Sequence, residues 1–175
     1  METTTALSPN SLAFIALCNE YCVTLENAAD TTRDDFIAST TRLLPRIYIA
    51  ATALEGTTMI DEAAYIAPAL EEDYYDSLRR NIENLLGADD SYLEVFESDM
   101  KYSDTPIGAS ISECLADIFQ SCYNFIEMIK DAPSEVVAEG IGAMKEDFEG
   151  YWSQILCNVM RPLNQLRFSP DQNNI

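Results

Sequence analysis

Apolar residues recur at steps of three and four along nearly the whole chain. On a helix with 3.6 residues per turn this spacing places them on one face, whereas a strand requires alternation of apolar and polar residues. No segment shows the bounded alternating pattern that is typical of strands. The stripe nearest the amino terminus consists of Phe14, Leu17, Cys18, Tyr21, Cys22 and Leu25. The sequence therefore predicts an all-α fold.

Capping and breaking residues divide this pattern into separate helices. Ser8 suits an N-cap and Pro9 the first helical position, where the missing N–H of proline costs nothing. Ser110 and Ser134 suit the same capping role later in the chain. We expect helices over about 8–28, 31–56, 71–86, 110–129 and 134–166. Pro45 falls inside the second of these, where it either kinks one long helix or separates two shorter ones.

The length and the apolar content of the chain fit one domain. With 175 residues, 47% of them apolar, the chain can bury a single core. Short connections between the predicted helices favour antiparallel neighbours. We expect a single bundle of about five to seven helices, mostly antiparallel, over 8–168 and a flexible tail over 169–175. The pattern leaves the structure of 57–70 and 88–109 open, with 90–104 either a short helix or an irregular packed loop.

The charge balance restricts the partners of the protein. Aspartate and glutamate outnumber lysine and arginine by 30 to 10, which gives a formal net charge of -20. Such a surface repels phosphate backbones and anionic membranes, so we expect neither direct nucleic-acid binding nor membrane association. It favours a basic protein partner.

The chain contains no histidine, which removes most familiar catalytic arrangements. Imidazole-based triads, cysteine-histidine pairs and zincin helices all require that side chain. Gly140 and Gly142 fall inside a helical pattern and indicate close packing rather than a loop that cradles phosphate. The sequence therefore favours a protein that is not an enzyme, and it predicts no cofactor.

The cysteines and the amino terminus indicate a cytoplasmic protein. Five cysteines are an odd number, and all lie in helical patterns beside apolar residues, as expected of free thiols in a reducing compartment. Residues 1–10 lack the basic and apolar regions of a secretory signal.

One carboxylate pair could bind a divalent cation. Glu113 and Asp117 lie four residues apart and share a helix face, and Glu20 or Glu26 of the first predicted helix could supply a third oxygen ligand. The alternative is that Glu113 closes a capping box with Ser110 while Asp117 sits at a solvated boundary. The absence of a Glu-x-x-His motif favours this alternative.

An acidic, tyrosine-rich segment is the candidate partner surface. Residues 61–104 contain 13 acidic residues against three basic ones. Tyrosines among acids provide contact area for a basic partner at low entropic cost. The candidate surface residues are Glu71, Glu72, Asp73, Tyr74 and Tyr75. Alternatively, these tyrosines dip into the core from an ordinary solvated surface.

Three segments carry a resemblance to a known family. They are Tyr92-Leu93-Glu94-Val95-Phe96, Leu115-Ala116-Asp117-Ile118-Phe119 and Tyr151-Trp152-Ser153-Gln154. On these residues most of the chain resembles a bacterial family catalogued as a domain of unknown function. The resemblance implies a small all-helical protein with an acidic Leu-Ala-Asp-Ile-aromatic helix and a C-terminal helix that contains tryptophan. It supplies no activity.

The family that the chain resembles places a His-Trp-Gly-x-His-like segment in its final helix. Asp117 and Trp152 match that family. The departures are Tyr151 and Ile155 at the two histidine positions, Ser153 at the glycine position and Cys114 at a position that is often acidic. We therefore do not expect a histidine-dependent function of the family to carry over to this chain.

These observations predict an acidic, non-enzymatic helical protein that acts as a protein-interaction or regulatory module. The alternative is a carboxylate-based helical protein that binds a divalent metal, with a possible hydrolytic role.

Overall fold

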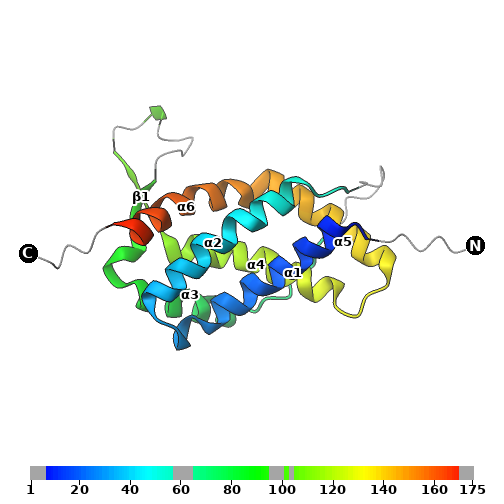
Figure 1. The fold of residues 1–175 in the computed structure, drawn as a ribbon, viewed down its shortest axis with the longest axis horizontal. Coiled ribbons are helices and arrows are strands. Elements are labelled where there is room, and N and C mark those ends of the chain that lie inside the picture. The colour runs from blue at the N-terminus through cyan, green and yellow to red at the C-terminus, as the bar shows by residue number, and fades with distance from the viewer. Residues whose placement is uncertain (1–6, 57–64, 95–100, 103–104, 170–175) are drawn as a thin grey trace, which may run out of the picture.

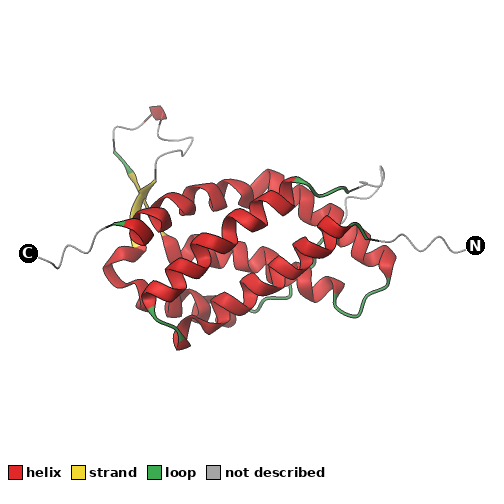
Figure 2. Cartoon of the chain, in the orientation of Figure 1, coloured by secondary structure: helices red, strands yellow, loops and turns green. Residues whose placement is uncertain are grey.

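Six α-helices account for most of the chain in the computed structural model, which describes residues 7–56, 65–94, 101–102 and 105–169 (Figure 1). Their bounds are Pro9–Glu26 for α1, Arg33–Thr52 for α2, Glu72–Leu86 for α3, Ile111–Ile129 for α4, Ser134–Asp147 for α5 and Ser153–Phe168 for α6. Short 3₁₀ turns follow α1 at Asn27–Asp30 and α3 at Gly87–Asp90, and a π-helical turn at Phe148–Trp152 joins α5 to α6. Figure 2 shows how completely helix dominates, so the predicted helical bundle is confirmed.

The helix α4 lies at the centre of the packing. It contacts α1, α3, α5 and α6, while α2 packs against α1 and α6. Figure 1 shows α1, α2 and α6 running side by side along the long axis of the molecule. The four helices α1, α2, α6 and α4 therefore close a ring around the core, and α3 and α5 flank α4 on its outer sides.

Aromatic side chains fill the core between these helices. Phe14 of α1 and Phe125 of α4 are fully buried, and their ring centroids lie 5.8 Å apart. Trp152 is also fully buried and meets the ring of Phe148 edge-on at 4.6 Å. The predicted helical stripes thus form one contiguous core.

Capping side chains mark the beginning of three helices: Ser8 for α1, Thr32 for α2 and Ser110 for α4. The Ser8 hydroxyl accepts a hydrogen bond from the backbone N–H of Ser11 at 3.1 Å, with proline at the first helical position, as predicted. Gly87 ends α3 with a φ of 59°, a conformation that suits glycine. The second helix is continuous through Pro45 and ends at Thr52, four residues before the predicted boundary.

Two expectations about the local structure are wrong. The strands β1 (Ser91–Glu94) and β2 (Ile107–Ser110) form an antiparallel hairpin where the sequence predicted no strand. Each strand has only four residues, too few to display an alternating pattern, and their pairing joins distant positions. In addition, Pro133 and not Ser134 is the N-cap of α5, and it provides no side-chain cap.

Close packing of α5 depends on its glycines. A Cβ on Gly140 would lie 3.0 Å from Ile129 Cγ2 and 3.4 Å from Phe125 Cε2. A Cβ on Gly56 would lie only 2.8 Å from the Cα of Gly142. Both contacts are tight, which confirms the interpretation of Gly140 and Gly142 as packing residues.

None of the helices described is both long and apolar enough to cross a membrane.

Candidate functional site

The central helix α4 carries a polar edge that meets α3. The Tyr75 hydroxyl of α3 donates a 2.6 Å hydrogen bond to Asp117 Oδ1. Partial burial raises the pKa of the Asp117 carboxyl, the Tyr75 hydrogen bond lowers it, and the negative charge of Glu113 raises it. Burial and the same hydrogen bond raise the pKa of Tyr75. The Asp117 carboxylate is therefore half-buried at the edge of the core, where it accepts a hydrogen bond from Tyr75 of the same chain.

A second polar group connects α4 with the hairpin. The Tyr92 hydroxyl of β1 donates to Glu94 Oε2 at 2.9 Å and lies 3.3 Å from Cys114 Sγ. Burial raises the pKa of the Cys114 thiol to about 11, and the hydrogen bond with Tyr92 partly offsets this effect. At neutral pH Cys114 is a protonated thiol, which makes it a poor nucleophile.

Tyr151 lies close to the same edge of α4. Burial raises the pKa of its hydroxyl, and the charges of Asp117 and Asp147 raise it further. The side chain of Tyr151 is 51% exposed. Because a protonated tyrosine is neutral, Tyr151 carries no charge at neutral pH, whereas a histidine at this position could be protonated.

The predicted metal ligands are not brought together. Glu113 lies near Asp117, but Glu26 interacts with Tyr74, and Glu20 forms a 3.5 Å ion pair with Arg46 of α2. Across the described residues, no three histidine, cysteine, aspartate or glutamate side chains form a group that could hold a metal ion. One of the two hydrogen bonds of the predicted capping box is present: the Ser110 hydroxyl accepts a hydrogen bond from the Glu113 N–H at 3.3 Å.

An exposed aromatic cluster lies where α3 crosses α4. The rings of Tyr74 and Tyr123 meet edge to face with centroids 5.9 Å apart, and each ring also contacts Phe119, at 6.1 Å and 5.5 Å. Phe119 is fully buried and anchors both tyrosines, while Tyr74 remains 38% exposed.

Three glutamates lie close enough to these tyrosines to raise their pKa values. Burial, followed by hydrogen bonding to Glu26, raises the pKa of Tyr74 to about 12. Burial also raises the pKa of Tyr123, as do the charges of Glu127, Glu26 and Glu71. The charged residues that act most strongly on either ring are all acidic. We call this set the tyrosine-glutamate surface: Tyr74, Tyr123, Glu26, Glu71 and Glu127.

The structure divides the predicted partner surface. Its exposed members are Glu71, Glu72, Asp73 and Tyr74, all at the beginning of α3. Tyr75 turns inward to Asp117. Tyr123 and Glu127 were not among the predicted surface residues, although their four-residue steps from Phe119 place all three on one face of α4.

Asp117 provides a test of this electrostatic arrangement. Because its pKa is raised, the folded protein binds more protons than the unfolded chain above the ordinary aspartate pKa of about 3.9. The contribution of Asp117 to the free energy of unfolding therefore falls as pH rises from about 3.9 through the raised pKa of the folded protein. We expect Asp117→Asn, which retains an acceptor for Tyr75, to make this decline shallower and to leave the protein at least as stable at neutral pH. Urea unfolding between about pH 4 and pH 7 measures both effects.

The matched control is Asp73→Asn, which removes one exposed carboxylate from α3. Both variants remove one negative charge and lower the repulsion between acidic residues equally. The difference between their pH dependences of the free energy of unfolding therefore reports the half-buried carboxylate of Asp117. A decline in Asp117→Asn as steep as in Asp73→Asn would contradict the assignment.

Comparisons with known proteins extend the similarity over nearly the whole chain. The model of a family described as Domain of unknown function (DUF5063) matches residues 5–169. The crystal structure of protein BF1032 from Bacteroides fragilis is similar with a TM-score of 0.79 and 28% sequence identity, covering 94% of this chain and 96% of that one. No curated protein matches the chain.

Proposed function

This chain belongs to the DUF5063 family of helical domains, whose function is unknown, and we propose that it is an acidic binding module that recognises a basic protein segment through its tyrosine-glutamate surface. The observation that carries the proposal is the pairing of two accessible tyrosine rings with three carboxylates.

A surface that combines tyrosine rings with carboxylates is suited to bind the side chains of lysine and arginine. A guanidinium or ammonium group is attracted to the face of a tyrosine ring, and a carboxylate beside the ring forms an ion pair with the same cation. Tyrosine loses little conformational entropy when a partner binds, because it has two side-chain torsions. Phe119 restrains both rings further through its buried contacts.

The overall charge supports the same partner. A net charge of -20 attracts a basic segment over long range and raises its rate of association. The rings of Tyr74 and Tyr123 then provide a contact area for the bound segment, which long-range attraction by the net charge does not provide. Catalysis and divalent metal binding have weaker support, since the protonated Cys114 thiol is a poor nucleophile and the predicted carboxylate ligands do not converge.

A labelled basic peptide tests the proposal. We expect a short peptide that alternates arginine and lysine with glycine to bind, as followed by fluorescence anisotropy. Affinity should fall between ionic strengths of about 0.01 M and 0.15 M, where the Debye length shortens from about 30 Å to about 8 Å. A peptide with glutamate in place of the basic residues should not bind.

Tyrosine variants separate the surface from diffuse charge. Tyr74→Ala should weaken binding by about tenfold, in line with the loss of a central aromatic contact. Tyr102→Ala removes a ring that is 91% exposed and lies outside the surface, so it should bind as the parent protein does. Equal losses in both variants, or no binding by the parent protein, would contradict the proposal.

A further inference from the structure

The facing sides of α1 and α2 form a cleft of about 420 Å³. Its lining combines hydroxyl groups with two arginines and a glutamate: Glu20, Thr24, Ala38, Ser39, Arg42, Leu43 and Arg46. Only ten basic residues stand against 30 acidic ones in the whole chain, so two arginines in one cleft are a marked local excess.

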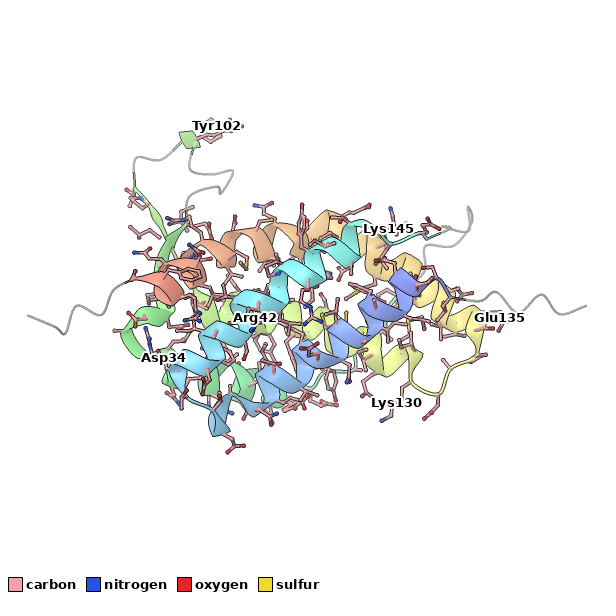
Figure 3. The ribbon with its side chains drawn as sticks, in the orientation of Figure 1. Asp34, Arg42, Tyr102, Lys130, Glu135 and Lys145 are labelled. Atoms are coloured by element: carbon pink, nitrogen blue, oxygen red, sulfur yellow. The ribbon has the colours of Figure 1, made fainter. Side chains whose placement is uncertain are left out.

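The helical spacing aligns the polar groups of this cleft. Ser39, Arg42 and Arg46 follow one another at steps of three and four and therefore lie on one face of α2. Glu20 and Thr24 are likewise four residues apart on α1, and α1 packs directly against α2. Figure 3 places Arg42 on α2 where that helix runs alongside α1.

The positive charge in the cleft is only partly neutralised. The single contact between Arg46 and Glu20 is long, at 3.5 Å. Arg42 has no ion pair or hydrogen bond with any side chain in the part of the chain that the structure describes. Two like charges four residues apart on a helix repel each other, and a bound anion would relieve the repulsion that Glu20 leaves.

A second arginine cleft gives a useful contrast. Arg33 lines a smaller cleft of about 180 Å³ together with Arg167. Arg33, however, forms ion pairs with both Asp34 and Asp89. The charge of Arg33 is therefore neutralised by ion pairs within the protein, whereas no such ion pair of Arg42 is present among the described residues.

We propose that the cleft formed by Arg42, Arg46 and Ser39 binds a small phosphate-bearing molecule. Guanidinium groups present paired N–H donors whose geometry matches phosphate oxygens, and the Ser39 hydroxyl can add a third donor. The volume falls within the range of small-molecule sites and exceeds what a bare phosphate needs. Thr24 is less suited to bind it, because its hydroxyl already donates to the Glu20 carbonyl at 2.8 Å.

The strongly acidic surface outside the cleft disfavours anion binding elsewhere on the molecule. A net charge of -20 repels anions from most of the surface, so nonspecific association with a polyanion is disfavoured. Saturable binding of a small phosphate compound therefore requires a local site. The site lies on α1 and α2 and does not depend on the tyrosine-glutamate surface.

Isothermal titration with inorganic pyrophosphate at an ionic strength of about 0.15 M tests the site. We expect one saturable site with a dissociation constant on the order of 1 mM. Arg42→Gln should weaken binding by about tenfold, the loss expected for one charge-assisted pair. Glu20→Gln removes the competing carboxylate and should tighten binding severalfold.

Matched variants control for the change in net charge. Arg80→Gln removes an exposed arginine from α3, and Glu135→Gln removes an exposed glutamate at the far end of the molecule (Figure 3). Neither should change the dissociation constant beyond about twofold, because charges far from the cleft are screened. Absence of saturable binding to the parent protein, or an Arg80→Gln loss equal to that of Arg42→Gln, would overturn the proposal.

Discussion

Simultaneous replacement of Glu26, Glu71 and Glu127 by glutamine is expected to weaken binding of the basic peptide by about tenfold or more. Each exposed ion pair contributes up to about 1 kcal/mol, so three pairs lost together amount to one or two orders of magnitude in affinity. Glutamine keeps the size of each side chain and one acceptor oxygen, and it removes the negative charge. Anisotropy titrations at low ionic strength measure the loss.

A second triple variant separates this local effect from a change in net charge. Glu135, Glu139 and Glu146 are exposed glutamates of α5. Their replacement by glutamine raises the net charge by the same amount but leaves the tyrosine-glutamate surface intact. We expect a decrease in affinity of no more than about threefold from the weaker long-range attraction. Equal losses in the two triple variants would show that the peptide senses only total charge.

Phe125→Ala is expected to lower the free energy of unfolding by about 3–5 kcal/mol, the usual cost of deleting a buried aromatic ring. Phe125 is fully buried on the central helix, where it packs on Phe14 of α1 and beside Gly140 of α5. The cavity left by alanine therefore opens where three helices meet, and the tight contacts around Gly140 limit how far the helices can close it. Urea unfolding followed by circular dichroism gives the difference.

Phe168→Ala is the matched control. Phe168 is 70% exposed at the end of α6, so its removal should change the free energy of unfolding by no more than about 0.5 kcal/mol. A small effect of Phe125→Ala, comparable with that of Phe168→Ala, would contradict the central position of α4.

Helix boundaries with a local chemical signal could be predicted from the sequence. Ser8 and Pro9 mark the beginning of α1, and a glycine with positive φ ends α3. The hairpin could not be predicted, because Ser91 and Ser110 pair across a long connection and each strand is only four residues long. No local pattern encodes such a pairing.

The candidate surface was only partly accessible to sequence reasoning. Tyr74 and Tyr75 were both candidates for the partner surface; Tyr74 is exposed, whereas Tyr75 is half-buried and donates to Asp117. Glu26 and Tyr123 lie far from Tyr74 in the sequence and join it only because α1, α3 and α4 pack together. Charge counting finds acidic segments, but it cannot find which carboxylates converge.

Amide NMR spectra of isotopically labelled protein, recorded during titration with the basic peptide, test the proposed binding site most directly. The largest chemical-shift changes are expected at Glu26, Glu71, Tyr74, Tyr123 and Glu127, with little change along α5. Changes that spread evenly over the acidic residues, or that centre on another helix, would contradict recognition of the peptide by the tyrosine-glutamate surface.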